Sequence, residues 1–450
     1  MFLIPFMQKL KFLFYLLFTI CLSSCEKEEL SMNDENGGVF TTKTLIESTK
    51  VAATVEASSF GFNANDATQA LLAALNSKND VIIIDKQSSD WVVGPIKVKN
   101  LLNKTIIFES GVVIRAKTGA FKSSNDKLFE LINAQNVDIR GNGAIFRMNK
   151  NEYTNGEWRH GLSLRKCKNV TIDRVTIENS GGDGIYISGY ENGSYSEDIT
   201  LKRVKSLNNK RQGMTLVSVS GIWVRDCEFS NNRGALPEAG IDIEPNSIYD
   251  RIVDVTIEKC TITNNGHAGA VLALLNLRSS SVPVSIRFLD CIFSMNHDST
   301  NKYPSSEIVL GADPINPVKG NVSFERCIIE GSKWGLLYSR KTSDAYHASF
   351  INCEAKNICQ NNSISPIYLE VPDYYTKTLP LGGYTFDNLK LQYSTNLPFL
   401  VIQGWKTLPS LKNINGKFII DAPKNSKPID FRSYNPSNNI NVRLDYSYIN

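Results

Sequence analysis

The sequence predicts an all-β solenoid, in which short parallel strands stack coil upon coil behind an N-terminal capping helix. The first of three observations is a repeat: seven segments of 11 to 13 residues alternate apolar and polar residues, which is the period of a strand. Neighbouring repeats lie between 23 residues apart (Val204 to Cys227) and 36 residues apart (Cys291 to Cys327). Such uneven spacing favours constant strands joined by variable loops over helical repeats. One aligned column reads Val175, Val204, Cys227, Cys260, Cys291, Cys327 and Cys353.

The second observation is a strand that opens with glycine, and the third is a column of asparagines. Parallel strands that stack at about 4.8 Å per coil place equivalent residues over one another. The cysteines then form an internal apolar stack, and the asparagines form a hydrogen-bonded ladder at a turn, because Asn tolerates left-handed backbone. The glycines are Gly161, Gly184, Gly213, Gly240 and Gly269, and the asparagines are Asn179, Asn208, Asn231, Asn264 and Asn357.

The remaining elements follow in chain order. A capped amphipathic helix is predicted at 65–76, within an N-terminal cap at 60–80 that covers the first coil, because an exposed strand edge invites aggregation. Strands are predicted at 81–85, 94–98 and 105–116, ahead of the repeats. The repeats weaken over 360–450, where we expect late coils and a C-terminal cover. The solenoid domain therefore covers 56–450.

Residues 1–24 read as an export signal. Lys9 and Lys11 precede an apolar run at 12–22, which is too short to span a bilayer and suits a signal peptide. The run ends in Leu-Ser-Ser before Cys25, which resembles the lipobox of bacterial lipoproteins, and Lys27 followed by two glutamates resembles the surface-export signal of Bacteroidetes lipoproteins. The resemblance implies lipidation at Cys25. Residues 25–55 read as a flexible tether, so we expect a lipid-anchored, cell-surface protein at the outer membrane.

Composition limits the function. The chain has 450 residues, of which 42% are hydrophobic and 21% charged, a globular balance. The formal net charge is +4, and two of the positive charges lie in the signal, so nucleic acid is not expected as a partner and we expect a monomer. Nine cysteines include one in the signal and Cys25. Most of the other seven are predicted to be buried free thiols, with disulfides between neighbouring coils as the alternative and with Cys353 and Cys359 as the exception.

On these repeats, the chain resembles the right-handed parallel β-helix proteins of the pectate-lyase-like superfamily over roughly 55–400. The helix at 65–76 and the glycine turns at Gly94, Gly111 and Gly143 resemble the first coils of polygalacturonase-type members. The resemblance implies a single-stranded right-handed parallel β-helix. The catalytic motifs of polygalacturonases (Asn-Thr-Asp, Asp-Asp, Gly-His-Gly, Arg-Ile-Lys) and the Arg-x-Pro-x-x-Arg of pectate lyases are missing, so no activity is implied.

Candidate site residues follow from the register of the glycine strand. Positions +1 and +3 after each glycine are apolar and face the core, so positions +2 and +4 face outward. Ionisable residues concentrate there and just before the glycine over a few coils, which marks a candidate active site on a rigid scaffold. The predicted catalytic residues are Asp183, Arg211, Asp242 and Glu244. The predicted substrate-binding residues are Trp158, Arg159, His160, Lys210, Glu238 and His267.

Three functions use these residues differently. In a glycoside hydrolase, Asp242 or Glu244 protonates the leaving oxygen and Asp183 activates water, while Arg211 and His160 orient the sugar. In a calcium-dependent lyase acting on a uronate glycan, Asp183, Asp242 and Glu244 hold Ca²⁺ and Lys210 or Arg211 abstracts a proton. A sugar epimerase is a further enzyme class. The non-catalytic alternative is a glycan-binding or structural β-helix with solvated charges. Asp242 and Glu244 on one strand repel each other unless something binds there, which favours an enzyme over a structural β-helix. Among the enzymes we favour a polysaccharide hydrolase.

Overall fold

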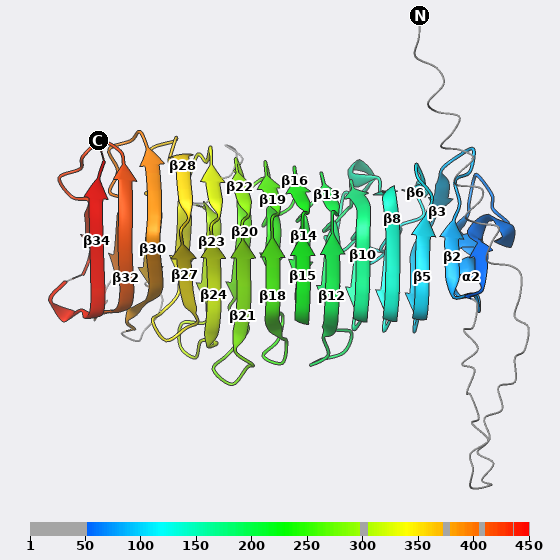
Figure 1. The fold of residues 1–450 in the computed structure, drawn as a ribbon, viewed down its shortest axis with the longest axis horizontal. Coiled ribbons are helices and arrows are strands. Elements are labelled where there is room, and N and C mark those ends of the chain that lie inside the picture. Colours follow the sequence, from blue (N-terminus) through cyan, green and yellow to red (C-terminus); the bar gives the residue numbers. More distant parts are fainter. Residues whose placement is uncertain (1–51, 298–304, 372–378, 405–409, 435, 450) are drawn as a thin grey trace, which may run out of the picture. The chain divides into compact units, whose positions relative to one another are not determined.

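The computed structural model describes residues 52–297, 305–371, 379–404, 410–434 and 436–449. Over this range the chain is a right-handed solenoid of parallel strands, drawn side by side along its length in Figure 1. The predicted fold class is confirmed. The export signal, the lipidation site at Cys25 and most of the predicted tether lie outside the described residues. The first strand, β1, begins at Thr54 and so includes the last two residues of that predicted tether. Among the described residues, no helix is long and apolar enough to span a bilayer.

Twelve strands form one sheet, which we call sheet B, and each of them pairs in parallel with the strand of the next coil. The glycine-led strands of the sequence repeat lie here. Its members are β4 (Ile96–Lys99), β7 (Phe129–Ile132), β9 (Leu162–Arg165), β11 (Ile185–Ser188), β14 (Met214–Leu216), β17 (Ala239–Ile243), β20 (Ala268–Leu274), β23 (Ser306–Ala312), β26 (Gly335–Arg340), β29 (Ile367–Val371), β31 (Leu400–Gly404) and β33 (Ile429–Arg432).

The other 22 strands form sheet A, in which most coils contribute two consecutive strands and β8, β10, β30, β32 and β34 run through as one. Its members are β1 (Thr54–Glu56), β2 (Val81–Ile84), β3 (Trp91–Val93), β5 (Leu102–Phe108), β6 (Val113–Ala116), β8 (Gln135–Arg147), β10 (Lys168–Glu178), β12 (Ser196–Lys202), β13 (Lys205–Leu207), β15 (Val219–Arg225), β16 (Glu228–Ser230), β18 (Ile252–Glu258), β19 (Thr261–Thr263), β21 (Val284–Leu289), β22 (Ile292–Ser294), β24 (Gly320–Glu325), β25 (Ile328–Glu330), β27 (His347–Ile351), β28 (Glu354–Ile358), β30 (Leu381–Tyr393), β32 (Leu411–Asp421) and β34 (Ile440–Tyr448).

The ends of the solenoid differ from each other. Helix α2 (Thr68–Leu75) lies at the N-terminal end, beside β2 in Figure 1, and buries Leu71 and Leu75. It starts three residues later than predicted, because the Asp66 carboxylate accepts hydrogen bonds from the main chain and hydroxyl of Thr68 in a turn. At the C-terminal end strands continue to β34, and the described residues there form no separate covering element. The three short 3-10 turns are η1 (Ala57–Phe60), η2 (Lys150–Glu152) and η3 (Pro436–Asn438).

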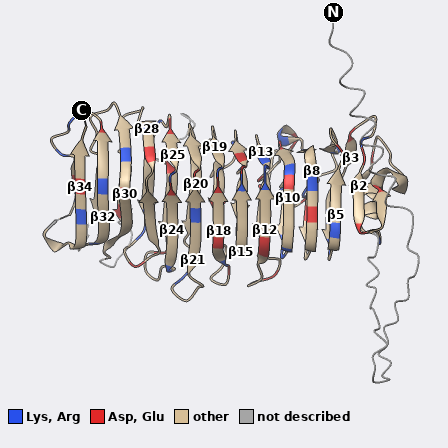
Figure 2. Ribbon diagram, in the orientation of Figure 1, with Lys and Arg blue, Asp and Glu red and all other residues tan. Residues whose placement is uncertain are grey.

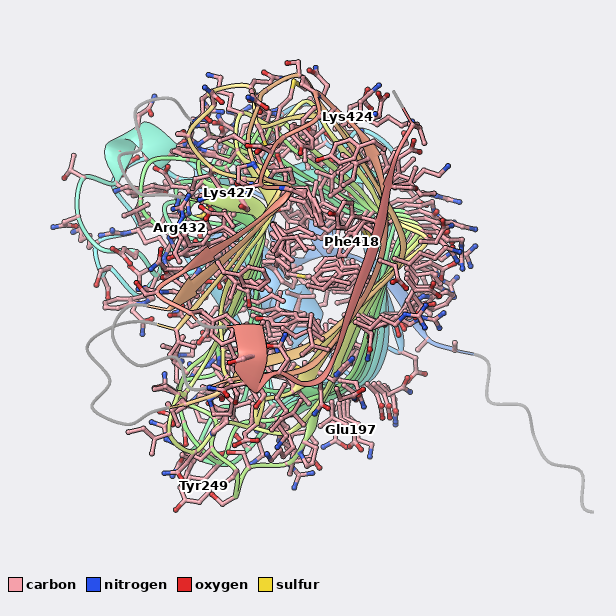
Figure 3. All side chains as sticks on the ribbon, turned by 90° about the vertical axis from the view of Figure 1, so that its left-hand side faces the viewer. Glu197, Tyr249, Phe418, Lys424, Lys427 and Arg432 are labelled. Atoms are coloured by element: carbon pink, nitrogen blue, oxygen red, sulfur yellow. The ribbon has the colours of Figure 1, made fainter. Side chains whose placement is uncertain are left out.

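The interior is apolar and the exterior is charged. In the view from the C-terminal end in Figure 3, Phe418 points inward, whereas Glu197, Tyr249 and Arg432 lie at the periphery. Phenylalanines of successive coils stack inside, with ring centroids 4.8 Å apart for Phe288 and Phe324 and 4.9 Å apart for Phe324 and Phe350. Outside, Figure 2 shows positive and negative residues interspersed along the strands that face the viewer. Burial of the repeated apolar column therefore drives the stacking.

The seven cysteines beyond the signal and Cys25 are all free and buried, as predicted for most of them. Each thiol of the column donates a hydrogen bond to a backbone oxygen, as Cys260 does to Glu258 at 3.3 Å and Cys291 does to Ile257 at 3.3 Å. Burial raises the pKa of the Cys167 thiol to about 11 and further suppresses its reactive thiolate.

We therefore expect the native protein to be inert to a thiol reagent and to react at these positions only once it is unfolded. The measurement is the number of labelled cysteines by mass spectrometry, with and without denaturant, on a variant that starts after Cys25. Labelling of Cys227, Cys260 or Cys291 at the same rate in both conditions would contradict the internal stack.

Two asparagine ladders run along the turn before sheet B. The outer ladder is the predicted one: the Asn208 amide donates to Asn179 at 2.6 Å, and these residues have positive φ. The inner ladder lies one residue further along the chain and was not predicted. Its members are Asn209, Asn232, Asn265 and Asn296, which are buried and joined amide to carbonyl at 2.8, 2.7 and 2.6 Å.

The inner ladder is one of the neighbours that require the glycine column. A Cβ on Gly184 would lie 1.9 Å from the Ser206 hydroxyl and 2.5 Å from the Asn209 amide, and one on Gly240 would lie 2.2 Å from the Ile262 side chain and 2.8 Å from the Asn265 amide. Each glycine thus leaves room for the asparagine of the ladder. Glu307 follows Gly269 in this column, and its carboxyl accepts from the main chain of Asn296 at 3.0 Å and from its amide at 2.7 Å. Glu307 thereby ends the ladder, and burial raises its pKa to about 7.

Candidate active site

The site lies on the outer face of sheet B, around β11, β14 and β17. Two columns of side chains face outward there, as predicted. In the first, Tyr186, Thr215 and Asp242 occupy paired positions on successive strands. Glu244 follows Asp242 by two residues and occupies the second column. Asp183 and Gln212 directly precede the glycines of their coils, so their side chains join the first column from the turn.

One guanidinium joins the acidic groups of the site. Arg211 lies 3.8 Å from a carboxyl oxygen of Asp183, 3.6 Å from Glu244 and 3.4 Å from Glu157. Its Nε also donates to the main-chain oxygen of Leu236 at 3.1 Å. These carboxyl groups raise the pKa of Arg211 against the opposing effect of burial. Asp183, Asp242, Glu244, Glu157 and Arg211 are called the Arg211 cluster below.

Two carboxyl groups of the cluster are fully buried, and burial changes their proton affinity. Burial raises the pKa of Asp183 to about 7, while the charge of Arg211 opposes the rise. The pKa of Asp242 is raised further, by burial and by the neighbouring charge of Glu244, and Gln212 donates to its Oδ2 at 2.7 Å. Both oxygens of Asp183 and Oδ1 of Asp242 accept no hydrogen bond of good geometry from described residues. Raised pKa values and unsatisfied buried oxygens are typical of acid/base groups.

The side chain of His160 contacts the main chain of Asp183. The ring is buried, its Nδ1 accepts the main-chain N–H of Asp183 at 3.1 Å, and it stacks on Tyr186 with centroids 4.5 Å apart. Burial and three nearby cations keep its pKa well below the usual value, so the ring is neutral and Nδ1 carries no proton. His160 therefore positions the Asp183 loop in this structure, and its ring, which was predicted to contact a sugar, is almost completely buried.

Other predicted substrate-binding residues have structural roles. Arg159 is buried, and its guanidinium donates to main-chain oxygens of neighbouring loops, including Phe121 at 3.1 Å. Lys210 donates to the main-chain oxygen of Tyr153. Glu238 accepts from the N–H of Gly234 at 2.6 Å and has positive φ. His267 is half-buried, and neither ring nitrogen makes a hydrogen bond to described residues.

Of the predicted binding residues, only Trp158 presents a large surface to solvent, with 52% of it exposed. It directly follows Glu157, which the sequence analysis did not select and which contacts Arg211. Gln212 was also missed, although it occupies the same position before its glycine as Asp183 does. The signal that could have identified Gln212 is its position in the same column as Asp183. No pattern indicated Glu157, because it lies in a loop outside the repeat.

The three predicted calcium ligands are not arranged around a common metal site. Among the described residues, no three His, Cys, Asp or Glu side chains are grouped so as to hold a metal ion. The guanidinium of Arg211 lies between Asp183 and Glu244, where a calcium ion shared by the two would have to be. The set Asp183, Asp242 and Glu244 therefore does not fit Ca²⁺ in this arrangement.

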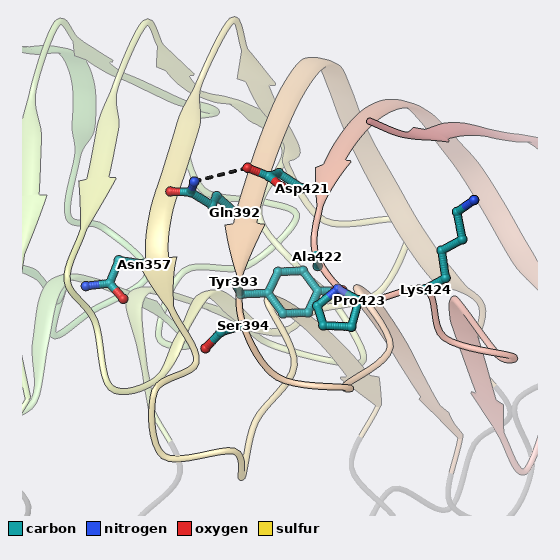
Figure 4. Close-up of a pocket in the computed structure, with 8 residues that line it drawn as sticks. All are labelled: Asn357, Gln392, Tyr393, Ser394, Asp421, Ala422, Pro423 and Lys424. Atoms are coloured by element: carbon teal, nitrogen blue, oxygen red, sulfur yellow. Dashed lines mark hydrogen bonds between the residues drawn. The ribbon is translucent and has the colours of Figure 1, made fainter. Parts of the chain in front are cut away.

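A separate hollow of about 620 Å³ lies near the C-terminal end, between the ends of β30 and β32 (Figure 4). Gln392 donates to Asp421 at 3.0 Å on its wall, and the ring of Tyr393 forms part of its floor. It contains no member of the Arg211 cluster. The hollow offers one carboxylate and no acid/base pair.

Comparison with known proteins identifies the family. The family model described as "Right handed beta helix region" matches residues 124–355, more than half of the chain. The chain belongs to the right-handed β-helix family. The matched region contains every member of the Arg211 cluster.

Individual proteins resemble the chain more weakly. The SPbeta prophage-derived uncharacterized protein YorA of Bacillus subtilis (strain 168) is 23% identical over 281 residues, 55% of this chain and 46% of YorA. The uncharacterized protein YclG of the same strain is 27% identical over 227 residues, 47% of this chain and 37% of YclG. This chain thus spans less than half the length of both curated relatives. Among solved structures, the A-module of the Azotobacter vinelandii mannuronan C-5 epimerase AlgE6 has a TM-score of 0.55 at 12% identity, covering 87% of this chain and 99% of the module. At that identity the likeness shows the fold alone.

Proposed function

We propose that this protein is an extracellular carbohydrate-active enzyme that hydrolyses a polysaccharide by acid/base catalysis at the Arg211 cluster. The observation that carries the proposal is the buried pair Asp183 and Asp242, which share one outward face with the partly exposed Glu244 around one guanidinium. Glycoside hydrolysis needs two carboxyl groups in different protonation states on either side of the scissile bond. The folds of solved glycan-active proteins are compatible with this use of sheet B.

The roles follow from the proton affinities. Asp242 keeps its proton at neutral pH, since burial and Glu244 disfavour its charge, and so it is the general acid that protonates the leaving oxygen. Asp183, held against Arg211, is the general base that activates water. Arg211 is partly exposed and lies against Asp183 and Glu244, so movement of its side chain admits the sugar. Trp158 offers a ring face on which the sugar can stack.

The test is a glycan panel. The protein from residue 26 onward is incubated with neutral and uronate-rich polysaccharides, with and without chelator, while new reducing ends and the ultraviolet absorbance of unsaturated uronate are followed. New ends without absorbance support hydrolysis. Absorbance that disappears with chelator supports the calcium-dependent lyase instead. Inactivity on every glycan favours the binding or structural β-helix, once epimerisation is excluded by proton exchange at the sugar ring.

The rate of hydrolysis should follow a bell-shaped pH profile. The base Asp183 acts only when deprotonated, so the rate rises with pH through about 7. The acid Asp242 acts only when protonated, so the rate falls again at more alkaline pH. The measurement is kcat/KM between pH 5 and 10. A rate that is already maximal at pH 5 contradicts the assignment of Asp183.

We also propose that the protein is lipidated at Cys25 and held at the outer membrane. The support is the lipobox-like sequence before Cys25 and the polar stretch after it. A Cys25→Ala variant should then appear as a folded protein in the soluble fraction of the producing cells, because one residue carries the whole anchor. Fractionation and immunoblotting measure this. A variant that stays with the membrane contradicts lipidation at Cys25.

A further inference from the structure

A second group of charged residues lies on the outer face of sheet B, towards the N-terminal end from the Arg211 cluster. Its members are Lys97 and Lys99 on β4, Lys127 before β7, Arg165 at the end of β9, and Tyr190 after β11. We call these five residues the cationic strip. Its place is set by register: Lys99 pairs with Ile132, and Ile132 pairs with Arg165. The strip and the Arg211 cluster thus occupy one continuous face.

Positive charge exceeds negative charge in the strip. Glu130, which is buried, lies 3.6 Å from Lys97 and 3.7 Å from Arg165 and so holds both in place. Among the described residues, the four cationic side chains of the strip form ion pairs within 4.0 Å with Glu130 alone. Asp126 acts on Lys127 as a further carboxyl group. Lys127 is itself buried, and the charges of Arg165 and Lys97 lower its pKa together with burial. The described protein therefore leaves part of this positive charge unbalanced.

Two further features suit the strip to a sugar with a negative charge. The guanidinium of Arg165 lies 4.8 Å from the ring centroid of Tyr190, and the ammonium of Lys99 lies 6.0 Å from the same centroid. The Tyr190 ring is 38% exposed and lies beside these cations. The Nε of Arg165 is buried and makes no hydrogen bond to described residues. An aromatic face beside an unsatisfied guanidinium combines stacking with charge-assisted hydrogen bonding.

The distance to the Arg211 cluster suits one extended ligand. Arg165 pairs with Ser188, and Glu244 lies in the same outward column two strands beyond Ser188. Three strand spacings place Arg165 roughly 14 Å from Glu244 along the solenoid. The positions between them in that column are Ser188 and Val217. A short stretch of polysaccharide can contact both the cationic strip and the Arg211 cluster.

We propose that the cationic strip binds a negatively charged sugar, carrying a carboxylate or a sulfate group, of the same polysaccharide whose glycosidic bond is cleaved at the Arg211 cluster. This inference rests on the proposed function, because it makes the strip part of that substrate site. It predicts an acidic polysaccharide as the substrate class, bound along the axis of the solenoid.

The test is binding to matched polymers that differ in charge, measured by calorimetry at low and high salt. The pairs are polygalacturonate with its methyl ester, and dextran sulfate with dextran. The wild-type protein is expected to bind the charged member of at least one pair about tenfold or more tightly, and the preference should shrink with salt. Arg165→Ala and Lys99→Ala should each remove most of it. Lys99 is exposed, so its substitution leaves the fold intact, and Lys168→Ala on sheet A is the matched control.

The outcomes separate this inference from the proposed function. No preference in either pair, or an equal preference in the Arg165→Ala and Lys99→Ala variants, overturns the strip as an anion site. An effect of Lys168→Ala as large as that of Lys99→Ala also overturns it, because the binding is then a general response to charge. Charge-dependent binding lost in both strip variants, without turnover of any glycan, supports the strip and refutes the hydrolase. Asp183→Asn should keep the binding preference and lose turnover.

Discussion

Substituting Asp183→Asn is expected to lower kcat of glycan hydrolysis by roughly 10² to 10⁴-fold, the range that a general base contributes. Asn is isosteric with Asp and neutral, and burial already favours the neutral form of this carboxyl group. The fold should therefore persist while the base is lost. The measurement is kcat on the active glycan, beside a thermal melt that shows the variant is folded.

The matched control for this variant is Asp138→Asn. Asp138 lies on β8 in sheet A, is partly exposed and pairs with Arg140 at 2.7 Å. The control should leave kcat unchanged, because a surface ion pair far from sheet B touches no reacting group. A wild-type rate in Asp183→Asn, with the fold intact, moves the base elsewhere in the Arg211 cluster.

The largest effect on stability is expected from Asn232→Ala, at about 3 kcal/mol of the free energy of unfolding. The Asn232 side chain accepts from the main chain of Asn209 at 3.0 Å and from its amide at 2.8 Å, and it donates to Asn265 at 2.7 Å. Alanine leaves these buried groups unpaired in the middle of the solenoid, where water cannot replace the lost partner. The measurement is the denaturation midpoint by circular dichroism.

Asn231→Gly is the control for Asn232→Ala. It removes the side chain of the neighbouring residue, which belongs to the outer ladder. Asn231 is exposed and has a φ of 62°, which glycine adopts without strain. Water can satisfy the groups that this change exposes, so a loss below about 1 kcal/mol is expected. Equal losses in the two variants would refute the distinct role of the inner ladder.

The sequence predicted the repeated parts of the molecule well. The glycine strands became sheet B, the cysteine column became a buried stack of free thiols, and the outer asparagines became a ladder with positive φ. Each of these is a local feature that recurs from coil to coil, so the equivalent residues of neighbouring coils support the same prediction. The inner ladder was missed although Asn208–Asn209, Asn231–Asn232 and Asn264–Asn265 are visibly doubled. Nothing in a doubled residue says which copy faces inward.

The site was predicted less completely. Register placed Asp242 and Glu244 on one outward face, but it also suggested that both are exposed. The structure buries Asp242 completely, and Gln212 from the preceding turn donates a hydrogen bond to it. Arg159, which donates to Phe121, Lys122 and Asn155, and His160 are also buried, although both were predicted to touch substrate. The conformations of the loops, which differ in length from coil to coil, decide which of these side chains are buried. The repeat contains no information on those conformations.

Sequence alone therefore determined the fold class, the inward and outward faces of each strand, and the coils that carry ionisable groups. These follow from the period of two along a strand and from stacking of equivalent residues. The tertiary structure alone decided which charges meet at Arg211, which carboxyl groups lose their water, and that Glu157 joins them from outside the repeat. Burial and charge proximity depend on how loops fold across neighbouring coils, and proton affinity follows from those two quantities.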